Sequence, residues 1–179
     1  MLSVIAPPGS LTAAIAARIA GTTPLSAPAA IVAAMPPVRM APLGDLEDAD
    51  FAAGCITPLA DLAATLAALL PDHRRIVLIG LSAGLGDWDA VLAGAYAAGA
   101  VGLMRSAALE YAQAGVAINF LALPSDDPAL AESAAPMAGA LLEWGAASGQ
   151  VIFCDGGANL RMRAARPRQA ALPTAPPPA

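Results

Sequence analysis

The chain has 179 residues, a formal net charge of −5, and 13% charged residues, and much of its 58% hydrophobic content is alanine. This length fits one domain with a core of its own, and the weakly charged, acidic composition argues against a nucleic-acid-binding protein. All nine basic residues are arginine, so the chain contains no lysine.

The first 50 residues predict a strand, a turn and a helix, followed by a less regular stretch. An apolar run at 2–6 predicts the strand, Pro7-Pro8-Gly9-Ser10 the turn, and the alanine-rich residues 11–20 the helix. Residues 21–50 are rich in proline and small side chains, and they carry only weak strand signals at 30–34 and 38–40.

From residue 59 onward, helices and buried strands alternate. The spacing predicts helices over 59–70, 89–112 and 134–144, and strands over 75–80, 117–122 and 150–154. Unbroken apolar strands that alternate with helices indicate an α/β fold, in which a parallel sheet is covered by helices on both faces. Residues 1–160 are thus predicted to form one domain. The arginine- and proline-rich tail 161–179 cannot bury a core, and we expect it to be disordered.

Targeting signals and metal motifs are not expected. Residues 1–5 carry no basic region of the kind that opens a signal peptide, and prolines interrupt the uncharged stretch 19–38, which argues against a membrane helix. Cys55 and Cys154 lie far apart without metal-ligand spacing, so we expect free thiols, no metal site and a cytoplasmic location.

Four segments, in the same order, resemble the short-chain dehydrogenase/reductase family. Residues 75–84 resemble the strand that leads to the catalytic serine, 102–112 the end of the active-site helix, 115–119 the next strand, and 148–157 the final strand with its Asp-Gly-Gly. The resemblance implies a Rossmann-like three-layer sheet. In intact members it also implies hydride transfer with NAD or NADP.

The residues that carry out this chemistry in the family are missing here. The positions that match the family's tyrosine and lysine are Ala93 and Ala97, the serine position is Leu81, and the asparagine position is near Pro58. A shifted alignment does not restore the tyrosine–lysine pair, because the chain has no lysine. Ser82 is beside the serine position and is expected to be a turn residue.

The cofactor half of the family pattern is missing as well. The three glycine positions of the dinucleotide-binding turn match Ala6, Ser10 and Thr12, and two prolines remove amide donors from that turn. Only 58 − 16 = 42 positions separate Ala16 from Pro58, fewer than the family's second to fourth strand–helix units occupy. We therefore interpret the chain as a truncated, catalytically inactive member that holds neither a dinucleotide nor a metal.

Members of this family pair through their two long helices and their last strand. The resemblance therefore implies an interface with an active subunit of the same family. The candidate interface residues are Leu59, Leu62, Leu66, Ala90, Gly94, Ala98, Val101, Arg105 and Phe153. The small residues of the second helix also fit a densely packed core helix, so both interpretations stay open.

Three functions remain. The first is a non-catalytic subunit of a heteromeric dehydrogenase whose active partner holds NAD or NADP; the second is a homodimeric regulatory module; the third is an enzyme with altered chemistry. Among single residues, His73 is expected in a solvated turn, and Trp144 in the core or an interface. The tail arginines at 161, 163, 166 and 168 are hypothesised to help close a partner's pocket.

Overall fold

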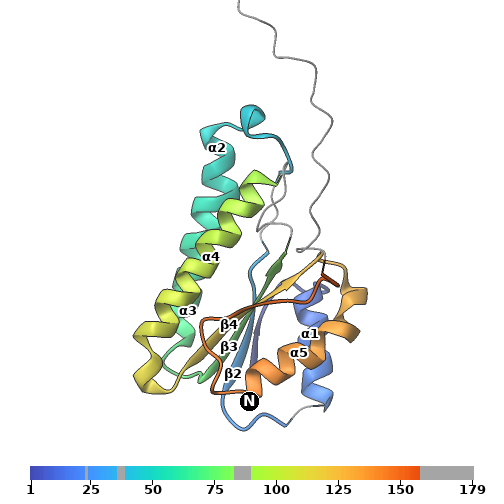
Figure 1. Cartoon of the computed structure of the whole chain (residues 1–179), viewed down its shortest axis with the longest axis vertical. Coiled ribbons are helices and arrows are strands. Elements are labelled where there is room, and N and C mark those ends of the chain that lie inside the picture. Colours follow the sequence, from blue (N-terminus) through green and yellow to red (C-terminus); the bar gives the residue numbers. More distant parts are fainter. Residues whose placement is uncertain (23, 36–38, 83–89, 158–179) are drawn as a thin grey trace, which may run out of the picture.

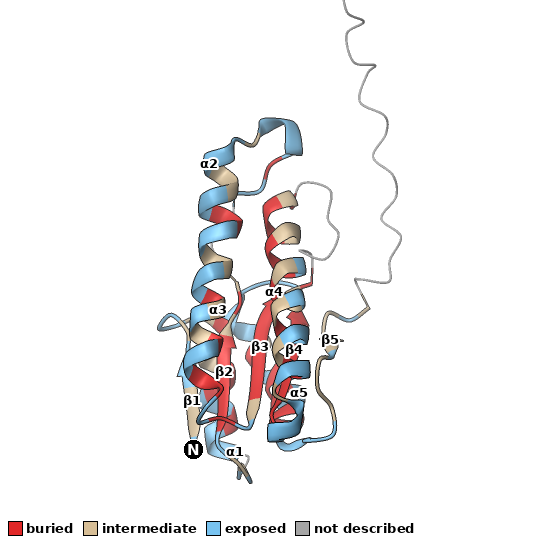
Figure 2. Ribbon diagram, turned by 90° about the vertical axis from the view of Figure 1, so that its left-hand side faces the viewer, coloured by how far each residue is buried: buried red, intermediate tan, exposed pale blue. Residues whose placement is uncertain are grey.

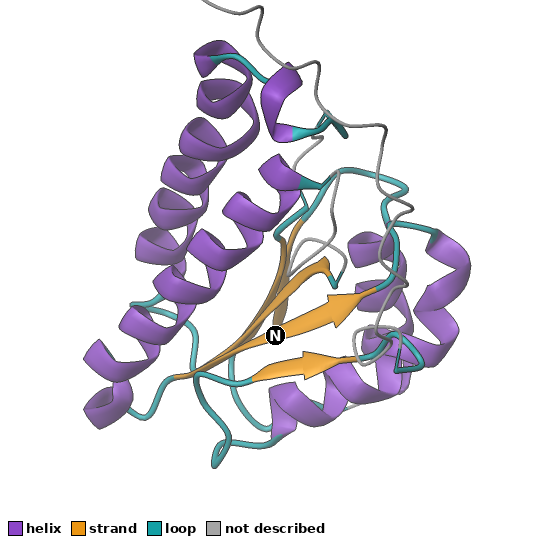
Figure 3. Cartoon of the chain, turned by 45° about the horizontal axis from the view of Figure 1, so that its top comes forward, coloured by secondary structure: helices purple, strands orange, loops and turns teal. Residues whose placement is uncertain are grey.

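A five-stranded parallel sheet forms the centre of the molecule (Figures 1 and 3). The computed structural model describes residues 1–22, 24–35, 39–82 and 90–157; the tail 161–179 and the segment 83–89 lie outside this range. The strands are β1 (Leu2–Ile5), β2 (Ala29–Ala33), β3 (Arg75–Leu81), β4 (Ala117–Leu123) and β5 (Val151–Phe153). They lie in the sheet in the order in which they occur in the chain. The predicted α/β class is confirmed.

Helices connect successive strands. The main ones are α1 (Leu11–Thr22), α2 (Asp48–Phe51), α3 (Thr57–Leu69), α4 (Val91–Glu110) and α5 (Ala131–Glu143). A π-helical turn, η2 (Ala52–Ile56), joins α2 to α3, and a 3-10 turn, η5 (Pro128–Leu130), precedes α5. Two further 3-10 turns are η1 (Leu43–Asp45) and η4 (Ala112–Ala114).

Most predicted elements are confirmed, with two differences before residue 60. The weak strand signal at 30–34 corresponds to β2, but Arg39 and Met40 lie in no strand, and residues 36–38 are outside the described range. The helix predicted from residue 59 begins instead at Asp48. There the Asp50 carboxylate accepts a hydrogen bond from the Glu47 backbone N–H (2.9 Å), and acidic side chains stabilise the first turn of a helix.

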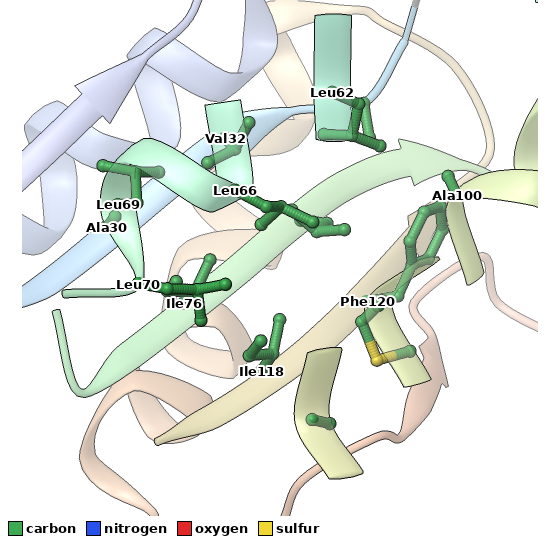
Figure 4. Packing of buried hydrophobic residues seen from close by; sticks show 14 of the residues in the cluster. Ala30, Val32, Leu62, Leu66, Leu69, Leu70, Ile76, Ala100, Ile118 and Phe120 are labelled. Atoms are coloured by element: carbon green, nitrogen blue, oxygen red, sulfur yellow. The ribbon is translucent and has the colours of Figure 1, made fainter. Parts of the chain in front are cut away.

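Alternating strand residues face two separate cores. On one face, α3 and α4 cover residues such as Val32, Leu78 and Phe120. On the other, α1 and α5 cover Ile31, Val77 and their neighbours. Figure 4 shows leucines of α3 lying over the first of these faces, and Figure 2 shows that buried residues concentrate in the strands and on the sheet-facing sides of the helices. The three-layer arrangement follows from this two-sided burial.

The strand–helix–strand connections on the two faces of the sheet differ in handedness. Every connection leads to the next strand in the same direction across the sheet, yet α3 and α4 lie on one face and α1 and α5 on the other. In Figure 2 the strands follow one another from left to right with α3 and α4 in front. The connections through α3 and α4 are therefore right-handed, as is usual, and those through α1 and α5 are left-handed, which is rare.

Candidate functional site

Ligands of open α/β sheets bind at the carboxyl ends of the strands, where two neighbouring strands send their connections to opposite faces. This condition is met between β1 and β2, because the chain leaves β1 toward α1 on one face and β2 toward α3 on the other. It is met again between β3 and β4. The candidate site is therefore the carboxyl edge of the sheet, bordered by the turn after β1 and the loop after β4.

The turn after β1 holds two of the three positions where the family has glycine. Ala6 follows the strand and is half-buried, and Ser10 precedes α1, where its hydroxyl accepts a hydrogen bond from the Ala13 N–H at 3.3 Å. Gly9 has a φ of 76°, a conformation that favours glycine. This turn caps its own helix with a side chain instead of presenting free amides to a ligand.

The third glycine position, Thr12, lies inside the packed layer between α1 and the sheet. Its side chain is fully buried, and its Oγ1 has no hydrogen-bond partner. A glycine at this position in dinucleotide-binding folds allows the helix to pack closely on the strand. The larger threonine occupies that space here, so the packing differs from that of a dinucleotide-binding turn.

The four positions that match the family's catalytic residues carry side chains without a transferable proton. Leu81 ends β3 and is half-buried, and Pro58 lies in the first turn of α3. Ala93 and Ala97 are buried on the inward side of α4. Beside Leu81, Ser82 is buried and its backbone N–H donates to the Leu123 carbonyl at 2.7 Å.

Tyr96 is the tyrosine nearest to the family position, and its surroundings disfavour acid–base chemistry. Its side chain is buried in the core between the sheet, α3 and α4. Burial, together with the nearby Cys55 and Asp61, raises the pKa of Tyr96 to about 12. A tyrosine acid–base catalyst at neutral pH needs a pKa closer to 7, so this environment shifts the phenol in the opposite direction.

The candidate interface residues are divided between the interior and the surface. Leu62, Leu66 and Ala90 are buried in this chain, which corrects their assignment to a contact surface. The reason is geometric: the two leucines are on the side of α3 that faces the sheet. Leu59 is half-buried, and its Cδ1 occupies the space beside Gly99 where a β-carbon would be.

The remaining candidates stay at least partly accessible. Gly94 and Val101 are half-buried, and Ala98 and Arg105 are exposed on α4. Phe153 on β5 is 39% exposed.

The prediction for His73 is wrong, and of the two alternatives for Trp144 the structure excludes the core. His73 is buried, not solvated: its Nδ1 donates to the Leu69 carbonyl (2.9 Å), and its Nε2 lies 2.8 Å from the Ser3 hydroxyl. It thereby ties the end of α3 to β1. Trp144 is 69% exposed and therefore is not part of the core. Both cysteines are free thiols, as expected; Cys55 is buried, and burial raises its pKa, whereas Cys154 is half-buried.

Two polar residues have roles that sequence reasoning missed. The Asn119 side chain donates to the Ala147 carbonyl (2.9 Å) and accepts from the Gln150 N–H (3.1 Å), which fixes the approach to β5. The Asp126 carboxylate accepts a hydrogen bond from the Leu11 N–H (3.3 Å), although the two residues are 115 positions apart. No local sequence signal predicts a contact of that range. Among the described residues, no three His, Cys, Asp or Glu side chains gather to form a metal site.

Two helical segments, Asp48–Leu69 and Val91–Glu110, are long and apolar enough to cross a membrane by length and composition alone. Both contribute buried side chains to the core on the sheet. Core helices of soluble proteins pass the same test, so this property is weak evidence for a membrane segment.

The chain is similar in structure to several solved enzymes, among them reductases and a dehydrogenase. An acetoin dehydrogenase from Enterobacter cloacae is similar with a TM-score of 0.62 and 20% identity, over 87% of this chain and 72% of that structure. The chain shares with these structures an α/β, Rossmann-like fold. A putative oxidoreductase from Escherichia coli K-12 matches with a TM-score of 0.63 and 19% identity, over 74% of this chain and 65% of that one.

An enoyl-[acyl-carrier-protein] reductase (NADH) from Aquifex aeolicus VF5 matches with a TM-score of 0.61 and 17% identity, over 75% of this chain and 63% of the reductase. The chain thus spans about two thirds of the length of several of these structures. No protein-family model and no curated protein sequence matches it.

Proposed function

We propose that this chain is a non-catalytic member of the short-chain dehydrogenase/reductase family that assembles with an active relative. The active partner would hold NAD or NADP and carry out hydride transfer, and this chain would complete and stabilise the oligomer. The residues at the four catalytic positions support this proposal, because leucine, proline and alanine side chains cannot donate or accept a proton. We further propose a cytoplasmic location, to which two free thiols are suited.

The observation that carries the proposal is the nearly uncharged outer surface of α3 and α4. Between residues 52 and 70 the only charged side chain is Asp61, and α4 has only Arg105 and Glu110. In the most apolar stretch of Asp48–Leu69, only 22% is buried, and in that of α4 only 44%. A helix exposed to water normally carries a polar outer face. These two helices instead leave alanines, Gly102 and Leu109 exposed. Such an apolar outer surface is typical of one that a partner protein covers.

The left-handed connection through α1 supports a truncated origin. In the doubly wound sheet the strand order is 3-2-1-4-5-6, so the first helix leads away from the fourth strand, and its connection is right-handed. If the second and third strand–helix units are removed, the first helix must lead to the fourth strand instead while it stays on its original face. The result is a left-handed connection between neighbouring strands, and the connection from β1 through α1 to β2 has this form.

The alternative is a homodimer that uses the same outer surface of α3 and α4, and it makes a different prediction for the purified chain. A heteromeric subunit made alone exposes this surface and should self-associate without a fixed stoichiometry. A regulatory homodimer should be monodisperse. For an enzyme with altered chemistry, Ser3 and His73 are a hydroxyl and a base in hydrogen-bonding contact (2.8 Å). The His73 ring is buried, its other nitrogen bonds to the Leu69 carbonyl and not to a carboxylate, and the pair lies at the amino ends of the strands, away from the candidate site.

The decisive experiment is mass determination of the tagged chain recovered from its native cells, with dinucleotide titration of the complex. We expect a fixed ratio of this chain to an intact dehydrogenase that has the tyrosine–lysine pair, and one dinucleotide per active subunit. Recovery of a homodimer without dinucleotide would favour the regulatory module. Dinucleotide binding by the isolated chain would overturn the proposal.

The variant Gly102→Leu tests whether the partner docks on α4. A β-carbon at Gly102 would have no atom within 4 Å, and leucine is a better helix former than glycine, so the chain itself should fold. If a partner packs on α4, the added side chain should reduce its recovery by about tenfold or more, because overpacking an interface costs about 1–3 kcal/mol.

The matched control is Gly21→Leu on α1, which also meets open space but lies on the other side of the sheet. It should recover the partner as the wild type does. If Gly102→Leu and wild type recover equal amounts of the partner, the partner does not pack on α4 at Gly102.

A further inference from the structure

The N-terminus of α1 is where a sheet of this kind holds the phosphates of a dinucleotide. The first backbone N–H groups of a helix have no partner within it, and together with the helix dipole they attract an anion. α1 has 12 residues and begins directly after β1 and its turn, at the carboxyl edge of the sheet. What satisfies these N–H groups here determines whether the position is open to a ligand.

Side chains and backbone atoms of the chain itself satisfy three of the four groups. The Leu11 N–H donates to the Asp126 carboxylate at 3.3 Å, and the Ala13 N–H donates to the Ser10 hydroxyl at the same distance. The Ser10 N–H donates to the Pro7 carbonyl at 3.2 Å. In the turn before them, Pro7 and Pro8 have no N–H to offer. Little donor capacity remains at this helix end.

The loop after β4 holds Asp126 in this place through contacts of its own. The neighbouring Asp127 N–H donates to the Ser125 hydroxyl (3.4 Å), and the Asp127 carboxylate accepts from the Ala129 N–H (2.9 Å) at the start of η5. Beyond η5, α5 packs against α1 in a shared core. The loop is therefore anchored on both sides, and Asp126 is the residue that reaches α1.

The charge at this position excludes a second anion. The ion pairs among the described residues are Arg18 with Glu132 and Arg39 with Asp50, so neither neutralises Asp126. A carboxylate within hydrogen-bonding distance of the amides repels a phosphate that approaches the same donors.

We propose that the Asp126 carboxylate occupies the place of a dinucleotide phosphate at the N-terminus of α1 and closes that position to phosphate ligands. This inference rests on the proposed function, since it explains how a chain without a cofactor keeps a stable helix end at the former cofactor site. Replacement of Asp126 should therefore reopen the N-terminus of α1 to phosphate ligands.

The inference can be tested by NMR. The full ¹⁵N-labelled chain is titrated with inorganic pyrophosphate, and the amide resonances of residues 11–14 are followed. In the wild type these resonances should not move. In Asp126→Ala they should move saturably, with an affinity about tenfold or more above any wild-type binding, because the helix end regains free amides and loses a repelling charge. Asp126→Asn keeps an acceptor oxygen but no charge, so it should bind with intermediate affinity.

Asp127→Asn is the matched control, because it removes the same charge from the adjacent residue without freeing the Leu11 amide. It should behave as the wild type does. Saturable wild-type shifts at residues 11–14, or folded Asp126→Ala and Asp126→Asn variants that do not bind pyrophosphate, would overturn the inference. A separate result would contradict the proposed function: the wild-type chain alone would bind NAD or NADP and carry out hydride transfer.

Discussion

The buried phenol of Tyr96 predicts a loss of stability at high pH that one substitution removes. The pKa of Tyr96 is about 12 in the folded chain, against 10 for an exposed tyrosine, and desolvation is the largest cause. Between these values the unfolded chain loses the phenolic proton while the folded chain keeps it. The folded state then binds more protons, so the free energy of unfolding falls as the pH rises from about 10 to about 12.

The size of this loss follows from the shift. Two pKa units at about 1.36 kcal/mol each give a maximum of about 2.7 kcal/mol. Tyr96→Phe keeps the ring in the core and removes the titrating group, so its stability should fall less over the same range. Urea unfolding at pH 9, 10, 11 and 12 measures the difference between the two proteins.

The half-buried Tyr111 at the end of α4 provides the control, and Tyr111→Phe should retain the full loss caused by Tyr96. Parallel stability curves for wild type and Tyr96→Phe would refute the reasoning, because they would mean that the Tyr96 phenol is solvated in the folded chain.

Two packing predictions can be checked by the same unfolding assay. Gly80→Ala should destabilise the fold by about 1–3 kcal/mol, because the new β-carbon would collide with the fully buried Phe120 ring, whereas Gly21→Ala meets open space and should be neutral or slightly stabilising; equal effects of the two would contradict this packing. Thr12→Val should stabilise the chain by about 1 kcal/mol by removing an unpaired buried hydroxyl, whereas Thr22→Val, whose hydroxyl donates to the Arg18 carbonyl at an exposed site, should change stability little; destabilisation by Thr12→Val would show that the Thr12 hydroxyl has a partner.

The strands after residue 70 could be predicted because buried parallel strands are continuous apolar runs. The runs at 75–80 and 117–122 are too short for a typical helix, so their length indicates strands. The segment 38–40 has a similar apolar content, but prolines at 36 and 37 lack the N–H groups that a ladder needs. The early start of the helix at Asp48 was missed, because its first turn is acidic and polar and contributes nothing to the apolar period.

The hydrophobic periodicity of a sequence does not predict contacts between residues that are distant in the chain. His73 has a polar sequence neighbourhood typical of a solvated turn, yet the Ser3 hydroxyl, 70 positions away, provides a partner that allows its burial. Burial on α3 shows the same limit: the helical period places Leu59, Leu62 and Leu66 on one side, but it does not indicate whether the sheet or a partner covers them. Only the arrangement of the layers answers that question.

The left-handed connection through α1, the satisfied α1 terminus and the nearly uncharged outer helices are consistent with a single explanation. Loss of two strand–helix units would force α1 to connect β1 to its new neighbour across the sheet while α1 stays packed with α5 on its original face. If no phosphate binds at its N-terminus, an acidic side chain stabilises α1 there instead, and the loop between β4 and α5 is close enough to supply Asp126 because α5 packs on the same face. The opposite face, with α3 and α4, lies away from these changes. Selection for assembly alone would preserve that face and leave the positions at the carboxyl edge free to become alanine, leucine and proline.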